Sequence, residues 1–130
     1  SARWRNAAGT WSPAALPAGR ARGIVVLNDP FFFSNRAKLV QFAASRRLPA
    51  IYFTRDFVDA GGLLSYGSSV PDSYRRAAGF VDKILKGANA ADLPIDQPTR
   101  FELVVNLQTA AALGIVIPPA ILASADDVIR

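Results

Sequence analysis

The sequence contains no cysteine, no histidine and no methionine among its 130 residues. Without cysteine and histidine there is no disulfide, no thiolate nucleophile, no imidazole acid or base and no conventional zinc site. Catalysis would have to rely on Asp/Lys or Ser/Lys pairs, and the sequence has neither a G-x-S-x-G motif nor a phosphate-binding GKS or GKT motif. We therefore predict no catalytic residue, no metal site and no cofactor.

Charged residues and long apolar runs are also scarce. Charged residues make up 19% of the chain and hydrophobic residues 51%, which is typical of a soluble globular protein. No apolar run approaches the roughly 18 residues that suggest a membrane span. The length favours one domain that buries roughly two thirds of its unfolded surface.

The net charge of +5 is concentrated at the beginning of the chain. Residues 1–22 carry four arginines, at positions 3, 5, 20 and 22, and no acidic residue, so the remainder is nearly neutral. This segment shows no heptad, no alternation and no signal-peptide layout. We interpret residues 1–22 as a basic tail or truncated junction rather than a nucleic-acid arm, and we predict no specific nucleic-acid partner.

From Gly23 onward, short β-rich runs alternate with helical patterns, which is typical of a parallel sheet with crossover helices. The predicted strands are GIVVL at 23–27, PAIYF at 49–53, GGLLSYG at 61–67 and RFELVVNL at 100–107. GIVVL is continuously apolar, so we expect it in the centre of the sheet. The pattern predicts the α/β class.

Four helices are predicted between and after these strands. Residues 30–47 repeat apolar side chains at Phe33, Ala37, Val40 and Ala44. The clearest helix begins at Ser68 or Ser69 and ends before Gly87. Its apolar stripe comprises Val70, Tyr74, Ala77, Val81, Ile84 and Leu85. After a proline-containing connector, QTAAALG predicts a short helix and PPAILASADDVIR predicts a last one, beginning at the proline pair.

The segment NDPFFF, at 28–33, combines a helix start with excess aromatic surface. Asp29 is placed as an N-cap and Pro30 as the first helical residue, where its missing N–H costs nothing. A cap does not explain Asn28, Phe31 or Phe32. We therefore expect an apolar site near this helix N-terminus.

Several motifs together resemble one family of transport proteins. The motifs are DPFF, FVDAGGLLSYG, AAGFVDKILKGANAADLP and FELVVNLQTAAALG, within residues 23–130. They resemble the C-terminal portion of ABC-transporter substrate-binding proteins of the type I periplasmic fold, the family that includes tryptophan and tyrosine binders. The resemblance implies two Rossmann-like lobes with a small solute held between them, a location in the periplasm or another extracytoplasmic space, and an ABC permease as partner.

The same resemblance implies that the N-terminal lobe and the first half of the second lobe would lie upstream of GIVVL, so the chain resembles a fragment. The predicted domain is then 23–130, with a second-lobe βαβ core at 23–67, a helix and connector at 68–97, and a C-terminal strand and helices at 98–130. In the family fold the chain would leave the second lobe near Gly67, give its long helix to the first lobe, and return near Pro98.

Ligands of open α/β sheets bind outside the carboxyl ends of the strands. Three predicted strand ends carry polar or aromatic groups: Asn28 with Asp29, Thr54 with Arg55, and Ser65 with Tyr66. For an amino acid, Arg55 would hold the carboxylate, Asp29 the amine, and Phe31, Phe32 or Tyr66 would form a stacking wall. Alternatively, Arg55 pairs with Asp56 or Asp59, and Tyr66 belongs to the core.

Three other functions compete with solute binding. A phospho-acceptor regulatory domain should show an acidic cluster at the strand ends with a lysine, whereas Asp29 stands alone there. A glycine-rich phosphate loop is not indicated, because AGG at 60–62 precedes a strand rather than a helix. A non-binding structural fragment remains the alternative. We expect a homodimer or higher oligomer in which the helix near 69–86 and the FELVVNL strand lie at the interface.

Overall fold

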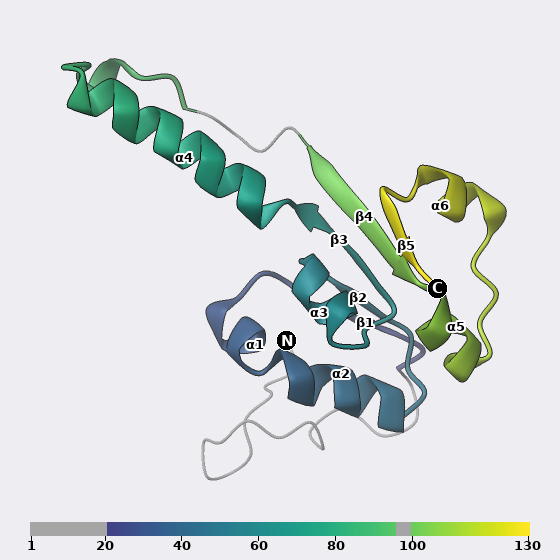
Figure 1. Ribbon diagram of the computed structural model, residues 1–130. Helices are drawn as coiled ribbons and strands as arrows, with labels where there is room; N and C mark the ends of the chain where they lie inside the picture. Colours follow the sequence, from purple (N-terminus) through teal and green to yellow (C-terminus); the bar gives the residue numbers. More distant parts are fainter. Residues whose placement is uncertain (1–20, 96–99) are drawn as a thin grey trace, which may run out of the picture.

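A computed structural model describes residues 21–95 and 100–130 and contains one five-stranded sheet (Figure 1). The strands follow one another in chain order, β1 (Ile24–Val25), β2 (Ala50–Tyr52), β3 (Leu64–Ser68), β4 (Phe101–Asn106) and β5 (Asp127–Ile129). Strands β1, β2 and β3 are mutually parallel, β4 is antiparallel to β3, and β5 is parallel to β4. The sheet is mostly parallel, as predicted, and the fold class is α/β. Most of the predicted tail at 1–22, and Pro98 in the connector, lie outside the described residues.

Three predictions about the strands are wrong. Strand β4 is reversed because the chain leaves the sheet after Ser68 and returns beside it at Phe101, which is its pairing partner. The GIVVL segment forms an edge strand rather than a central one, with Val25 and Leu27 66% and 71% exposed. The last helix, predicted over PPAILASADDVIR, ends at Ser124, and the final residues of that segment form strand β5 instead, which is too short to show a period of its own.

The predicted helix at 30–47 is two helices, α1 (Pro30–Ser34) and α2 (Arg36–Ser45). They separate at Asn35, whose side-chain amide donates to the carbonyl of Phe31 at 2.9 Å and so competes with regular helix bonding. The buried side of α2 consists of Leu39, Val40 and Ala43, so the predicted stripe was correct at Val40 and wrong at Ala37 and Ala44, which are exposed.

The other short helical elements are α3 (Arg55–Asp59), the 3-10 turn η2 (Ala90–Asp92), α5 (Leu107–Leu113) and α6 (Pro119–Ser124). Helix α3 was not predicted, because five residues are too few to display a period. Helix α5 begins where the Asn106 side chain accepts a hydrogen bond from the Thr109 N–H at 3.0 Å. It ends at Gly114, whose φ of 69° is left-handed, as expected for a glycine at this position.

Helix α4 (Val70–Leu85) confirms the predicted long helix, with Ser69 as its N-cap and Gly87 after its end. It extends away from the rest of the molecule (Figure 1), and none of its residues is buried. Within the described residues, no helix is long and apolar enough to cross a membrane.

The interior is divided into two groups of buried side chains. The first joins β1 and β2 to α2 and α3 and comprises Val26, Leu39, Val40, Ala43, Ala50, Tyr52 and Phe57. The second lies among β3, β4 and the C-terminal helices and comprises Leu63, Val105, Ala110 and Ile117. The hydroxyl of Thr109 on α5 donates to the carbonyl of Gly61 at 2.9 Å and links the two halves of the sheet.

Candidate functional site

A cavity of about 570 Å³ lies where β1, β2 and β3 end and β4 begins. We call it the aromatic cavity, because four of its lining residues are Phe33, Phe53, Tyr66 and Phe101. The rings of Tyr66 and Phe101 stack with centroids 5.4 Å apart and planes 21° apart. The remaining lining is Asn28, Pro30, Ser34, Thr54, Gly67, Ser68 and Val70. Flat apolar walls with a few polar groups suit a small organic ligand.

A second cavity, of about 380 Å³, adjoins the first and shares Phe33, Thr54, Gly67, Ser68 and Val70 with it. We call it the acidic cavity, because Asp56, Asp59 and Glu102 line it together with the single cation Arg55. Its remaining lining residues are Ser69, the N-cap of α4, and Pro71, in the first turn of that helix. Within residues 21–95 and 100–130, no group of three or more acidic, histidine or cysteine residues is arranged to hold a metal ion.

The predicted site residues are only partly brought together. Asn28, Thr54 and Tyr66 line the aromatic cavity, and Thr54 and Arg55 line the acidic cavity. Four predicted residues line neither of these two cavities. They are Asp29, Phe31, Phe32 and Ser65.

Each of these four has another place in the fold. The Asp29 side chain accepts a hydrogen bond from the Phe31 N–H at 2.7 Å, which confirms the predicted cap. Phe32 packs against the first buried group, and Phe31 contacts it edge-on while remaining 47% exposed. Ser65 is buried in mid-sheet, where it pairs with β2 and β4.

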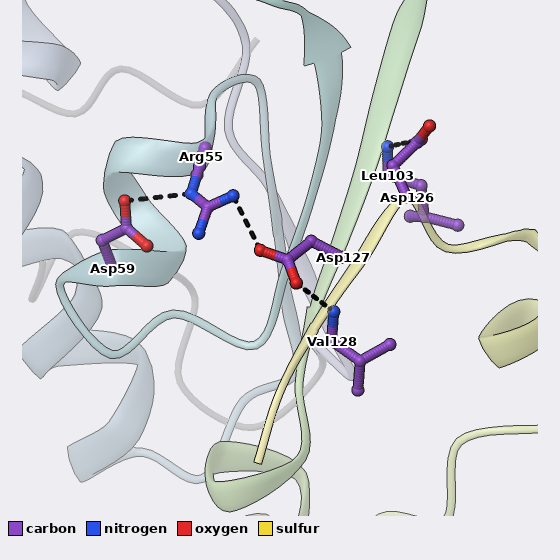
Figure 2. A network of polar contacts seen from close by, with 6 residues as sticks. All are labelled: Arg55, Asp59, Leu103, Asp126, Asp127 and Val128. Carbon is purple, nitrogen blue, oxygen red and sulfur yellow. Dashed lines mark hydrogen bonds and ion pairs between the residues drawn. The ribbon is translucent and has the colours of Figure 1, made fainter.

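Arg55 is held by two carboxylates (Figure 2). Its guanidinium lies 2.7 Å from the Asp127 carboxylate, on β5, and 3.3 Å from that of Asp59, one turn along α3. The hydrogen bond with Asp127 is the main reason why the pKa of Arg55 is raised above its ordinary value. The ion pair with Asp59 is one of the alternatives predicted from the sequence, and it is present. The ion pair with Asp127, on strand β5, was not predicted.

Thr54 is the most unusual polar residue of the site. It is only 9% exposed, and its hydroxyl oxygen is buried with no hydrogen-bond partner among the described residues. A buried hydroxyl without a partner costs about 1–3 kcal/mol, so such groups are rare in folded proteins. Thr54 lines both cavities, and its buried hydroxyl would reach a ligand there only if the side chain rotated toward the cavity.

Sequence reasoning missed Phe101 and Glu102, which lie at the start of a strand rather than at its end. The return of the chain beside Gly67 was the available signal, because a strand that starts where another ends must be antiparallel to it. Phe33 and Phe53 were missed for another reason: they also fit the core, and Phe53 packs edge-on against Phe57 at 5.1 Å.

A mostly parallel sheet with cavities at its strand ends is the arrangement in which open α/β proteins bind ligands, and one lobe of a periplasmic binding protein is built in this way. A family model described as ABC transporter substrate binding protein matches residues 14–129. The chain therefore belongs to the ABC transporter substrate-binding protein family, as the sequence motifs indicated.

Solved structures agree with this assignment. The ABC domain from Streptococcus pneumoniae in complex with L-Trp is 29% identical, with a TM-score of 0.78 over 85% of this chain. A conserved domain protein from Vibrio cholerae is 27% identical, with a TM-score of 0.78 over 82%. A ligand-free, open substrate-binding protein with adhesive properties from Clostridium difficile shares the fold at 21% identity and a TM-score of 0.56 over 82%.

This chain spans only 36–38% of the length of these solved relatives. A search of curated proteins gave no significant match.

Proposed function

We propose that this chain is the solute-binding component of an ABC importer, or part of one, and that it binds an amino acid in the cavities at the strand ends. The observation that carries the proposal is the aromatic cavity at the strand ends, to whose lining Thr54, a residue with an unpartnered buried hydroxyl, belongs. The aromatic cavity supplies apolar walls, and the similar Streptococcus pneumoniae domain was solved in complex with L-Trp.

The physiological partner would be an ABC permease, and the location would be periplasmic or otherwise extracytoplasmic. A role in transport rather than catalysis is supported by family membership. The predicted ligand residues Asn28, Thr54 and Tyr66 keep their place in this proposal. Arg55 would contact a ligand carboxylate only after exchanging one of its two carboxylate partners.

An amide NMR titration of the 130-residue chain with L-tryptophan tests the proposal. We expect shifts of the signals of residues that line the aromatic cavity. Thr54→Val, which keeps the shape and removes the hydroxyl, should weaken binding about fivefold, because one hydrogen bond is worth about 1 kcal/mol. The same variant should be as stable as the wild type or more stable, because a buried unpartnered oxygen is removed.

Thr109→Val is the matched control, since its hydroxyl bonds Gly61 and lies outside both cavities. It should leave the affinity unchanged. Equal affinity in wild type and Thr54→Val would remove Thr54 from the site. A chain that responds to no free amino acid would contradict the ligand class.

Assembly through α4 is a second candidate function, and it rests on the exposure of this helix. The six apolar residues of its stripe are Val70, Tyr74, Ala77, Val81, Ile84 and Leu85, and none is buried. Burying a large apolar side chain gains roughly 1.5–3 kcal/mol, so two copies that cover each other's stripe would be stabilised. The FELVVNL strand, predicted at the interface because of an open edge, is β4, which is paired on both sides by β3 and β5. That part of the prediction is wrong, and the open sheet edge is instead that of β1. A homodimer is the simplest closed arrangement.

Light scattering after size exclusion measures this directly. We expect a dimeric mass at micromolar concentration for the wild type and a monomeric mass for Val81→Lys, which places a charge in the stripe. Gly79→Lys is the control, because residue 79 lies on the opposite face of α4, where an added Cβ meets no atom within 4 Å. A well-folded wild-type monomer would refute assembly through α4.

A further inference from the structure

The described part of the chain leaves one face of the sheet exposed over β1 and β2. Side chains alternate between the two faces of a strand, and residues paired across a ladder share a face. Val26, Ala50 and Tyr52 are buried in the group of side chains that includes those of α2 and α3. The alternate residues lie on the opposite face and are all exposed: Val25, Leu27 and Ile51. We call these three residues the bare sheet face.

The sequence of β1 is typical of a strand that is covered on both faces. Residues 23–27, GIVVL, are continuously apolar, although β1 lies at the edge of the sheet. Such runs occur in parallel strands that are buried on both faces. Helices α2 and α3 cover one face of β1 and β2, so within the described residues the bare sheet face lacks the second cover that its sequence predicts.

Helix α4 carries a surface that matches the bare sheet face. Its apolar stripe, from Val70 to Leu85, is about 22 Å long, and residues 23–27 extend about 16 Å along the sheet. A helix packed along strands is the usual layer of an α/β fold. Helix α4 does not form this layer on its own sheet, because it extends away from the sheet (Figure 1) and has no buried residue. The helix of a second copy is free to do so.

The area of this contact agrees with that of a stable dimer. The stripe and the bare sheet face together contain eight large apolar side chains that are exposed. Each offers on the order of 100 Å², so one contact buries about 800 Å² and a reciprocal pair of contacts about 1,600 Å², the size of a standard stable interface. Two stripes packed against each other would bury only about 1,000 Å² and would leave both bare sheet faces in water.

We infer that two copies of this chain exchange α4, so that the stripe of each helix covers the bare sheet face of the other copy in a two-fold dimer. The inference rests on the assembly through α4 proposed above, and it names the surface that the helix covers. The bare sheet face contributes no residue to the lining of the aromatic or the acidic cavity. Substitutions on it therefore test assembly without changing the residues of the candidate solute site.

Single cysteines can report the contact, because the chain contains none of its own. Ile51→Cys and Val81→Cys chains are mixed in urea, refolded together and treated with a short bis-maleimide cross-linker. We expect the two different chains to be cross-linked at least fivefold more than either pair of identical chains, as measured by mass spectrometry. Gly79→Cys in place of Val81→Cys is the control. Residue 79 lies on the opposite face of α4, so its cross-link to Ile51→Cys should fall to background.

Ile51→Lys tests the sheet side of the contact by light scattering after size exclusion. A charge placed in an apolar contact is costly, so this variant should weaken dimerisation at least tenfold. Ile95→Lys is the control and should stay dimeric, because Ile95 is 93% exposed and lines a cavity with Gly79, away from the stripe. If Ile51→Lys fails to fold, Val25→Lys, at a more exposed position of the same face, replaces it.

The outcomes separate this inference from the assembly on which it rests. Cross-linking of Val81→Cys chains to each other, without cross-links to Ile51→Cys, would overturn the exchange and leave assembly through α4 standing. A dimer lost in Val81→Lys but kept in Ile51→Lys would do the same. A monomeric wild-type chain, or a dimer that persists in both lysine variants, would overturn both.

Discussion

Replacing Phe57 by alanine is expected to lower the free energy of unfolding by about 3–5 kcal/mol, which is the usual cost of emptying a large buried aromatic site. Phe57 is completely buried on α3. Its ring stacks on Tyr52 at 4.8 Å and meets the edges of Phe53 at 5.1 Å and Phe33 at 6.5 Å. The loss is a large fraction of the roughly 5–15 kcal/mol that stabilises a small domain.

Urea unfolding followed by circular dichroism measures the effect. Phe31→Ala is the matched control, because Phe31 is 47% exposed and its removal should cost about 1 kcal/mol or less. Phe57 also supports Phe33 and Phe53, which line the aromatic cavity, so its loss should weaken ligand binding as well. Equal free energies of unfolding for the two variants would contradict a central place for Phe57 in the first group of buried side chains.

Replacing Gly67 by alanine is expected to destabilise the chain by about 1–3 kcal/mol or more, the range for overpacked sites. Gly67 lies near the end of β3, and an added Cβ would overlap the carbonyl oxygen of Phe53, which is backbone and cannot rotate away. To relieve the overlap, the end of β3 would have to move away from the residue that follows β2. Because Gly67 lines both cavities, the same movement would change their shape.

Gly79→Ala makes the same chemical change where there is space. Residue 79 lies in α4, with no atom near an added Cβ, and alanine is favoured over glycine in a helix by about 1 kcal/mol. Gly67→Ala should therefore lower the midpoint of thermal unfolding, whereas Gly79→Ala should leave it unchanged or raise it slightly, because α4 adds little to the stability of the sheet. A stabilised Gly67→Ala variant would contradict the close approach of β3 to Phe53.

The sequence predicted the longer elements, whose hydrophobic period and capping residues lie within one continuous segment. Helix α4 has a stripe, a capping serine and a terminal glycine, and all three were readable without the structure. The order of strands β1 to β4 along the chain was predictable as well. Strand β5 and helix α3 were missed, because three and five residues carry no measurable period and form only through tertiary contacts.

For the candidate site, the sequence indicated the edge of the sheet at which the two cavities lie, but not all of the residues that line them. The carboxyl ends of parallel strands meet by rule, which brought Asn28, Thr54 and Tyr66 together. Glu102 and Phe101 depend on the reversal of β4. The pairing of Arg55 with Asp127 depends on it as well, since β5 runs parallel to β4 and begins near the same edge. Non-local strand direction is not encoded in any window of the sequence.

Helix α4 departs from the sheet and returns to it at one place, because Ser68 and Phe101 are paired neighbours. In polymer terms, the chain between Ser68 and Phe101 is a loop whose two ends are held together by this pairing. The entropic cost of such a closure rises only with the logarithm of loop length, by about 0.6 kcal/mol for each doubling. With no buried residue of its own, α4 adds little to the stability of the sheet. Lengthening or shortening the outer part of α4 should therefore cost the sheet beneath it little free energy of unfolding.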